Sequence, residues 1–156
     1  MDPAAAYVVT QMMRSVIEEG TATKAQVLDR VVVGKTGTSQ ESRNVWFAGF
    51  SPELVAGVWV GFDDNKPLGR AYGGTVALPI WIRFMGRALV GVPAREFAPP
   101  EDVVSLRIDR STGEPTSSTD DADSLDEVFI AGTEPDEKTQ PLLNPFLIDE
   151  EERDGG

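Results

Sequence analysis

The sequence contains no cysteine and no histidine among its 156 residues. Disulfide bonds, thiol chemistry, histidine-ligated metals and any mechanism with a histidine base are therefore excluded. Basic residues are also scarce, with 14 lysines and arginines against 26 acidic residues. Because no basic stripe is present to neutralise phosphates, nucleic-acid binding is disfavoured. We expect no nucleic-acid partner, no metal site and no cofactor.

Long hydrophobic runs are missing as well. The most apolar window, 76–92, carries Arg83 and Arg87 and is too short and too charged to span a bilayer. The acidic excess lies late in the chain: residues 1–100 hold 10 basic and 9 acidic residues, whereas residues 101–156 hold 4 and 17. We expect part of a domain over 1–98, followed by an acidic, partly disordered extension over 99–156.

The spacing of the apolar residues, and the residues that begin and end each segment, predict an α/β (α+β) fold with a three-stranded antiparallel meander. Asp2 and Pro3 are a good helix start, with a capping side chain followed by proline in the first turn. Short polar links between successive apolar runs are typical of antiparallel neighbours. The predicted elements are a helix over 3–19, strands over 30–38, 44–51 and 54–62, and a helix over 78–90.

Both faces of the third predicted strand are apolar, so we expect it inside the sheet with cover on both sides. For the same reason the aromatic side chains are expected in the core; they are Trp46, Phe47, Trp59 and Trp81. The acidic tail is expected to be largely irregular, with a short strand at 103–108 and disorder at 115–127 and 149–156.

The segment with the clearest chemical content follows an apolar run, Val31-Val32-Val33, and reads Gly-Lys-Thr-Gly-Thr-Ser over residues 34–39. Lys35 supplies a positive charge, and Gly37 allows a ligand to approach the backbone closely. Thr36 and Thr38 are two apart on a strand, so their hydroxyls share a face. Two hydroxyls beside a lysine suit a carboxylate. A phosphate loop is excluded, because that motif needs glycine at position 29, which is aspartate, and a following helix.

The Lys-Thr-Gly strand with its flanks resembles the penicillin-binding transpeptidases, in particular the class A (bifunctional) penicillin-binding proteins. The resemblance rests on GKTGTSQESRNVWFAGFSPELVAGVWVGFDD, on GGTVALPIWIRFM, and more weakly on RIDRSTGEP and FIAGTEP. It implies the C-terminal part of a transpeptidase domain that cross-links peptidoglycan stem peptides through an acyl-serine. It also implies binding of β-lactams and work at the periplasmic, extracytoplasmic face of the membrane.

The same resemblance implies roles for individual residues. Lys35 would tune the electrostatics of the acylation site, and the backbone N–H of Thr38 would form half of the oxyanion hole. The side chains of Thr36 and Thr38 would hold the substrate carboxylate, Gly37 would keep the edge open, and Ser39 would extend the substrate-binding segment.

No serine is followed by lysine three residues later, so the Ser-x-x-Lys nucleophile motif of the family is absent from this chain. Ser42-Arg43-Asn44 matches the family's Ser-x-Asn motif in letters only, because the family places that motif upstream. We therefore expect a fragment that is inactive alone and needs the preceding part of the same protein, which would carry the export signal and anchor. The alternatives are a fragment of a serine β-lactamase-like hydrolase and a non-catalytic binding module or remnant.

Overall fold

The computed structural model of the chain describes residues 2–135. The chain divides after Glu101 into two compact units. In the first unit the helix α1 spans Pro3–Glu18, as predicted. Its start is stabilised by Asp2, whose side chain accepts a hydrogen bond of 2.8 Å from the backbone N–H of Ala5. A short 3₁₀ helix, Thr23–Leu28, occupies the segment between α1 and the sheet, where only a polar connection was expected.

Three strands form the predicted antiparallel meander, in the order β1-β2-β3. They are slightly shorter than predicted: β1 spans Val33–Thr38, β2 spans Asn44–Phe50 and β3 spans Val55–Gly61. Thr36 pairs with Phe47 and Gly37 with Trp46. Because side chains alternate along a strand, this register sets which residues of β1 share a face with the core.

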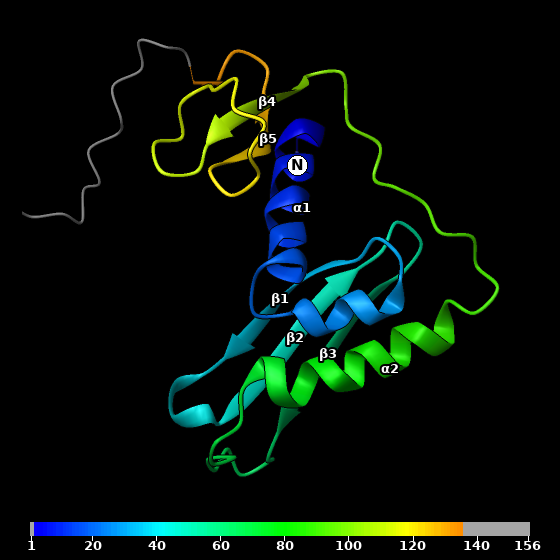
Figure 1. The fold of residues 1–156 in the computed structure, drawn as a ribbon. Helices are drawn as coiled ribbons and strands as arrows, with labels where there is room; N and C mark the ends of the chain where they lie inside the picture. Colours follow the sequence, from blue (N-terminus) through cyan, green and yellow to red (C-terminus); the bar gives the residue numbers. More distant parts are fainter. Residues whose placement is uncertain (1, 136–156) are drawn as a thin grey trace, which may run out of the picture. The chain divides into compact units, whose positions relative to one another are not determined.

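Helix α2, Leu78–Ala88, lies along one face of the sheet (Figure 1) and confirms the second predicted helix. Its core side chains Leu78, Trp81 and Met85 are fully buried. The ring of Trp81 meets Phe47 of β2 edge-on at 4.9 Å between centroids, and its Nε1–H donates to the carbonyl of Ala56 at 3.0 Å. The apolar core of the first unit therefore lies between α2 and this face of the sheet.

On the opposite face of the sheet the structure differs from two predictions. In the described part of the chain β3 is an edge strand rather than an internal one, and Val55 is 75% exposed. Trp46 and Trp59 are 49% and 44% exposed, whereas Phe47 and Trp81 are buried as expected. The reason is the alternation of side chains: Trp46 and Trp59 are paired neighbours on the face that α2 does not cover.

The second unit contains an antiparallel pair, β4 over Val103–Asp109 and β5 over Ser124–Ile130. The strand expected at 103–108 is confirmed. The disorder expected at 115–127 is wrong, because this segment includes the start of β5 and a bridge between Ile108 and Pro115. The disorder expected at 149–156 lies outside the described residues.

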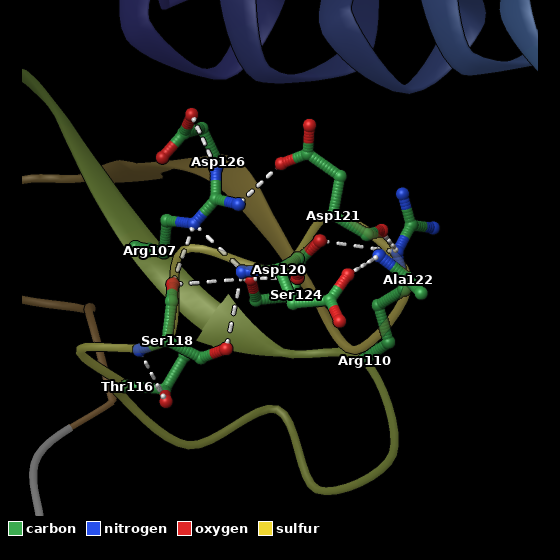
Figure 2. Close-up of polar contacts among 9 residues, drawn as sticks. All are labelled: Arg107, Arg110, Thr116, Ser118, Asp120, Asp121, Ala122, Ser124 and Asp126. Carbon is green, nitrogen blue, oxygen red and sulfur yellow. Dashed lines mark hydrogen bonds and ion pairs between the residues drawn. The ribbon is translucent and has the colours of Figure 1, made fainter.

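Arg107 organises the polar segment of this second unit (Figure 2). Its guanidinium forms ion pairs with Asp121 and Asp126, and its Nε–H donates to the carbonyl of Ser118 and the hydroxyl of Ser124, both at 3.1 Å. Ser124 is fully buried. The Ser/Thr/Asp-rich composition that suggested disorder is therefore used for hydrogen bonds around one arginine.

Candidate functional site

The Lys-Thr-Gly-Thr segment lies on β1, which is an edge strand of the sheet (Figure 1). The backbone N–H of Ser39 donates to the carbonyl of Asn44 at 2.9 Å, which identifies the odd-numbered residues of β1 as those bonded to β2. The N–H and C=O groups of Thr36 and Thr38 consequently point away from β2, toward the free edge. A ligand beside this edge can therefore form backbone hydrogen bonds there.

Lys35 and Thr36 are brought together at the edge, although their side chains start on opposite faces. The Nζ of Lys35 lies 3.2 Å from the carbonyl oxygen of Thr36 and 3.5 Å from its Oγ1. Lys35 is exposed, and Thr36 is half-buried. An ammonium and a hydroxyl that converge in this way can donate to the two oxygens of one carboxylate.

Thr36 and Thr38 share the face that carries Phe47, as the spacing predicted. Each hydroxyl has a protein partner from a distant part of the chain. The Oγ1 of Thr36 lies 3.3 Å from the Oγ1 of Thr21, and the Oγ1 of Thr38 accepts from the N–H of Gly73 at 3.2 Å. Because accepting uses only a lone pair, the hydroxyl of Thr38 can still donate its proton to a ligand.

Close packing against Gly73 supports the middle of β1. A Cβ on Gly73 would lie 2.9 Å from the carbonyl oxygen of Gly37 and closer still to that of Trp46. Gly73 is buried at the start of a π-helical turn, Gly73–Ala77, that leads into α2. Glycine is needed here because the two backbones touch.

Ser39, the last of the predicted site residues, belongs to the turn after β1. Its Oγ accepts from the backbone N–H of Asn44 at 2.9 Å. The short 3₁₀ helix Gln40–Ser42 follows. Ser42 and Arg43 therefore lie in the turn between β1 and β2, and Asn44 is the first residue of β2.

Two contributors to the site were not found from the sequence: the hydroxyl of Thr21 and the backbone of Gly73. Thr21 lies 15 residues before its partner Thr36, and Gly73 lies 35 residues after its partner Thr38. Neither position carries a local signal, because each is defined only by what the folded chain brings beside β1.

Carboxylates elsewhere in the described residues do not form a further centre. Over residues 2–135 no group of three or more histidine, cysteine, aspartate or glutamate side chains is arranged to hold a metal ion. Asp64 forms a hydrogen bond with the backbone of Lys66 and an ion pair with its Nζ at 3.4 Å. None of the helices in that range has the length and apolarity needed to cross a bilayer.

Comparison with known proteins gives the same family throughout. The sequence matches the penicillin binding protein transpeptidase domain over residues 1–86. It is 50% identical over 115 residues to penicillin-binding protein 1A of Pseudomonas aeruginosa, a match covering 72% of this chain and 14% of that protein. It is 43% identical over 130 residues to penicillin-binding protein 1A of Aquifex aeolicus, covering 82% of this chain and 18% of the relative.

The fold agrees with a solved structure of the same kind. Penicillin-binding protein 1A from Haemophilus influenzae superimposes with a TM-score of 0.77 at 33% sequence identity, covering 92% of this chain and 22% of that one. The mixed arrangement of helices and antiparallel strands is therefore that of a penicillin-binding protein. The chain spans less than a fifth of the length of the two curated relatives, at 14% and 18%.

Proposed function

The chain belongs to the penicillin-binding protein transpeptidase domain family, and we propose that it forms one wall of the acylation site of a serine D,D-transpeptidase that cross-links peptidoglycan. The observation that carries this proposal is the free edge of β1, where Lys35 and Thr36 converge and the N–H of Thr38 points outward. The anion-facing groups and the backbone donor lie two residues apart on one strand. Two residues of a strand span about 6.6 Å, so both groups are within reach of one short extended peptide.

The groups of this wall have distinct tasks. Lys35 tunes the electrostatics of the acylation site and adds a positive charge beside the terminal carboxylate of the stem peptide, which the hydroxyls of Thr36 and Thr38 bind. Hydrogen bonds to such a charged group contribute about 1.5–3 kcal/mol each. The N–H of Thr38 stabilises the oxyanion that develops at the acylated carbonyl, and loss of one such donor typically lowers kcat by about 10²–10³. The Ser-x-x-Lys nucleophile motif does not occur in this chain, so acyl transfer requires residues outside it.

The partners follow from this role. The substrates are peptidoglycan stem peptides, β-lactams occupy the same edge, and the work takes place at the extracytoplasmic face of the membrane. The exposed side chains of Val55, Trp46 and Trp59 support a protein partner on the uncovered face of the sheet. We assign that face to the remainder of the transpeptidase domain.

Binding to the edge of β1 is tested by titrating the ¹⁵N-labelled chain with an N-acetylated dipeptide of two D-alanines. The backbone amides of Thr36 and Thr38 should shift. Lys35→Gln and Thr36→Val should each weaken binding about tenfold, because each removes a donor to the carboxylate. Thr10→Val is the matched control, since the Thr10 hydroxyl bonds only within α1, to the carbonyl of Ala6 at 2.8 Å. Absence of shifts at β1 would overturn the proposal.

Inactivity of the chain alone is tested by incubation with penicillin followed by intact-mass measurement. We expect no mass increase, because an oxyanion donor without its nucleophile cannot form an acyl-enzyme. A covalent adduct would contradict this part of the proposal and would identify an unexpected nucleophile by peptide mapping.

A second candidate is favoured by the buried cluster of the first unit, which includes Phe47, Leu78, Trp81 and Met85. Such a core can support a non-catalytic module that binds peptide carboxylates at the same edge. Thermal unfolding discriminates between the two candidates. A sharp, cooperative transition of a monomer favours the module, whereas a broad transition favours part of a larger domain.

A further inference from the structure

Helix α2 carries an exposed apolar stripe on the side that faces away from the sheet. Ile80 and Phe84 are both 50% exposed, although the opposite side of the helix is buried against the sheet. Residues four apart lie on the same face of a helix, so Ile80, Phe84 and Ala88 form one line. A hollow of about 450 Å³ runs along this line, and its lining residues are Ile80, Arg83, Phe84, Arg87 and Ala88.

Two arginines flank the stripe without an anionic partner of their own. Arg83 and Arg87 are exposed, and within residues 2–135 neither forms an ion pair. Other arginines of the chain are paired with carboxylates, namely Arg14, Arg30, Arg43 and Arg107. The guanidinium groups of α2 are therefore available to carboxylates of another molecule.

The sequence around α2 is free of acidic residues. From residue 65 to residue 95 there is no aspartate or glutamate, although the whole chain holds 26 of them and has a net charge of −12. The basic residues of this stretch are Lys66, Arg70, Arg83, Arg87 and Arg95. A positive and partly apolar surface is complementary to an apolar surface that carries carboxylates.

The type of cation and the position of the stripe indicate a protein partner. A guanidinium is a planar fork that binds both oxygens of one carboxylate. Arg83 and Arg87 are about one helical turn, or 5.4 Å, apart, which matches carboxylates one turn apart on a second helix. A lipid surface instead favours a helix whose main apolar face is free to enter the interface. That face of α2 is already buried against the sheet.

We propose that this stripe is a docking surface for a helical segment of another protein, whose contact face combines apolar side chains with carboxylates one turn apart. The apolar side chains pack against Ile80 and Phe84, and the carboxylates bind Arg83 and Arg87. Because the stripe is short, the contact is weak and reversible, in the class of interfaces below about 1,200 Å². The docking does not depend on the proposed function, since no residue of β1 lines the hollow.

The experiment titrates the ¹⁵N-labelled 156-residue chain with a monomeric synthetic helix of about 15 residues. Leucine and glutamate each recur at every third or fourth position of this peptide, on one face. The backbone amides of Ile80, Phe84 and Arg87 should shift, and that of Thr38 should not. A peptide of the same composition in scrambled order keeps the charge but loses the common face, so it should bind about fivefold more weakly.

Variants separate docking from a general attraction between opposite charges. The double variant Arg83→Gln/Arg87→Gln should lower the affinity for the ordered peptide about tenfold, because both carboxylate partners are lost. Lys66→Gln/Arg70→Gln is matched in charge and removes two exposed residues that do not line the hollow. This control should leave the affinity unchanged. All four positions are exposed, and an unaltered near-UV circular dichroism spectrum verifies the fold of each variant.

Every other result would overturn the proposal. Equal losses in the two double variants, or equal binding of the ordered and scrambled peptides, would reduce the effect to net charge. Shifts of the α2 amides on dilution of the chain alone would assign the stripe to a second copy. Tighter binding to phosphatidylglycerol vesicles than to the ordered peptide would assign it to a lipid surface. Absence of shifts on α2 would refute docking there.

Discussion

The two units of this chain are each stabilised internally by a different kind of interaction. Every apolar residue that is buried in the described part of the chain lies in the first unit, between Ala4 and Leu89. Among the described residues of the second unit, the one buried side chain is that of Ser124, which bonds to Arg107 and to the carbonyl oxygens of Ser118 and Asp120. The stability of the first unit should therefore be most sensitive to the size and shape of its core side chains. The stability of the second unit should be most sensitive to the loss of charged side chains.

Removal of a core ring should have the largest effect. Trp81→Ala should lower the free energy of unfolding of the first unit by about 3–5 kcal/mol, because it opens a cavity against Phe47. Urea denaturation followed by near-UV circular dichroism measures this. Trp59→Ala, at a ring 44% exposed, should cost only about 1 kcal/mol. Equal losses for the two variants would mean that the core is not centred on α2.

A single methyl group at the site should have the next largest effect. Gly73→Ala should cost about 1–3 kcal/mol in the free energy of unfolding, because the new Cβ would overlap the backbone of Gly37. The amide resonance of Thr38 should move as its bond with Gly73 is disturbed. A methyl group added at Gly57 would face open space, with no described atom within 4 Å beyond its chain neighbours, so Gly57→Ala should be neutral or slightly stabilising. A tolerated Gly73→Ala would refute the close backbone approach.

Loss of one charge should break the second unit without affecting the first. Arg107→Gln removes two ion pairs and should accelerate amide hydrogen exchange along β4 and β5, while α2 keeps its protection. Arg83→Gln, at an exposed position of α2, is the matched control and should change neither unit. Unchanged protection in Arg107→Gln would mean that the apolar side chains of the hairpin suffice.

Acid should produce the smallest and most selective effect. The hydrogen bond from Arg107 lowers the pKa of Asp121, and bonds from Ser111 and Thr112 lower the pKa of Asp109. A lowered folded-state pKa contributes stability that is present above the ordinary aspartate value of about 3.9 and is lost as the pH falls through the lowered value. Protection factors of the β4–β5 amides should therefore fall below about pH 4.

Asp121→Asn tests whether this carboxylate carries the acid response. The variant should show weaker hairpin protection at neutral pH and a smaller change on acidification, because its side chain cannot titrate. An acid response identical to that of the unaltered chain would assign the effect to other carboxylates.

Periodicity accounts for what could be predicted of the fold. Helix α1 begins at a capping aspartate and a proline, and the side chains of the strands alternate between the two faces of the sheet. The exposure of the Trp46 and Trp59 side chains could not be predicted. An apolar residue on a partner-binding surface gives the same sequence pattern as an apolar residue in the core. The order around Arg107 was missed because polar contacts between residues 11 to 19 positions apart have no sequence period.

The candidate site divides in the same way. The sequence by itself determined the chemistry of Lys35, Thr36 and Thr38 and the common face of the two threonines, because alternation along a strand is a local property. Only the tertiary structure decided that β1 lies at an edge and that Gly73 packs against it. Those arrangements depend on strand order and on contacts between distant residues, which local sequence patterns do not encode.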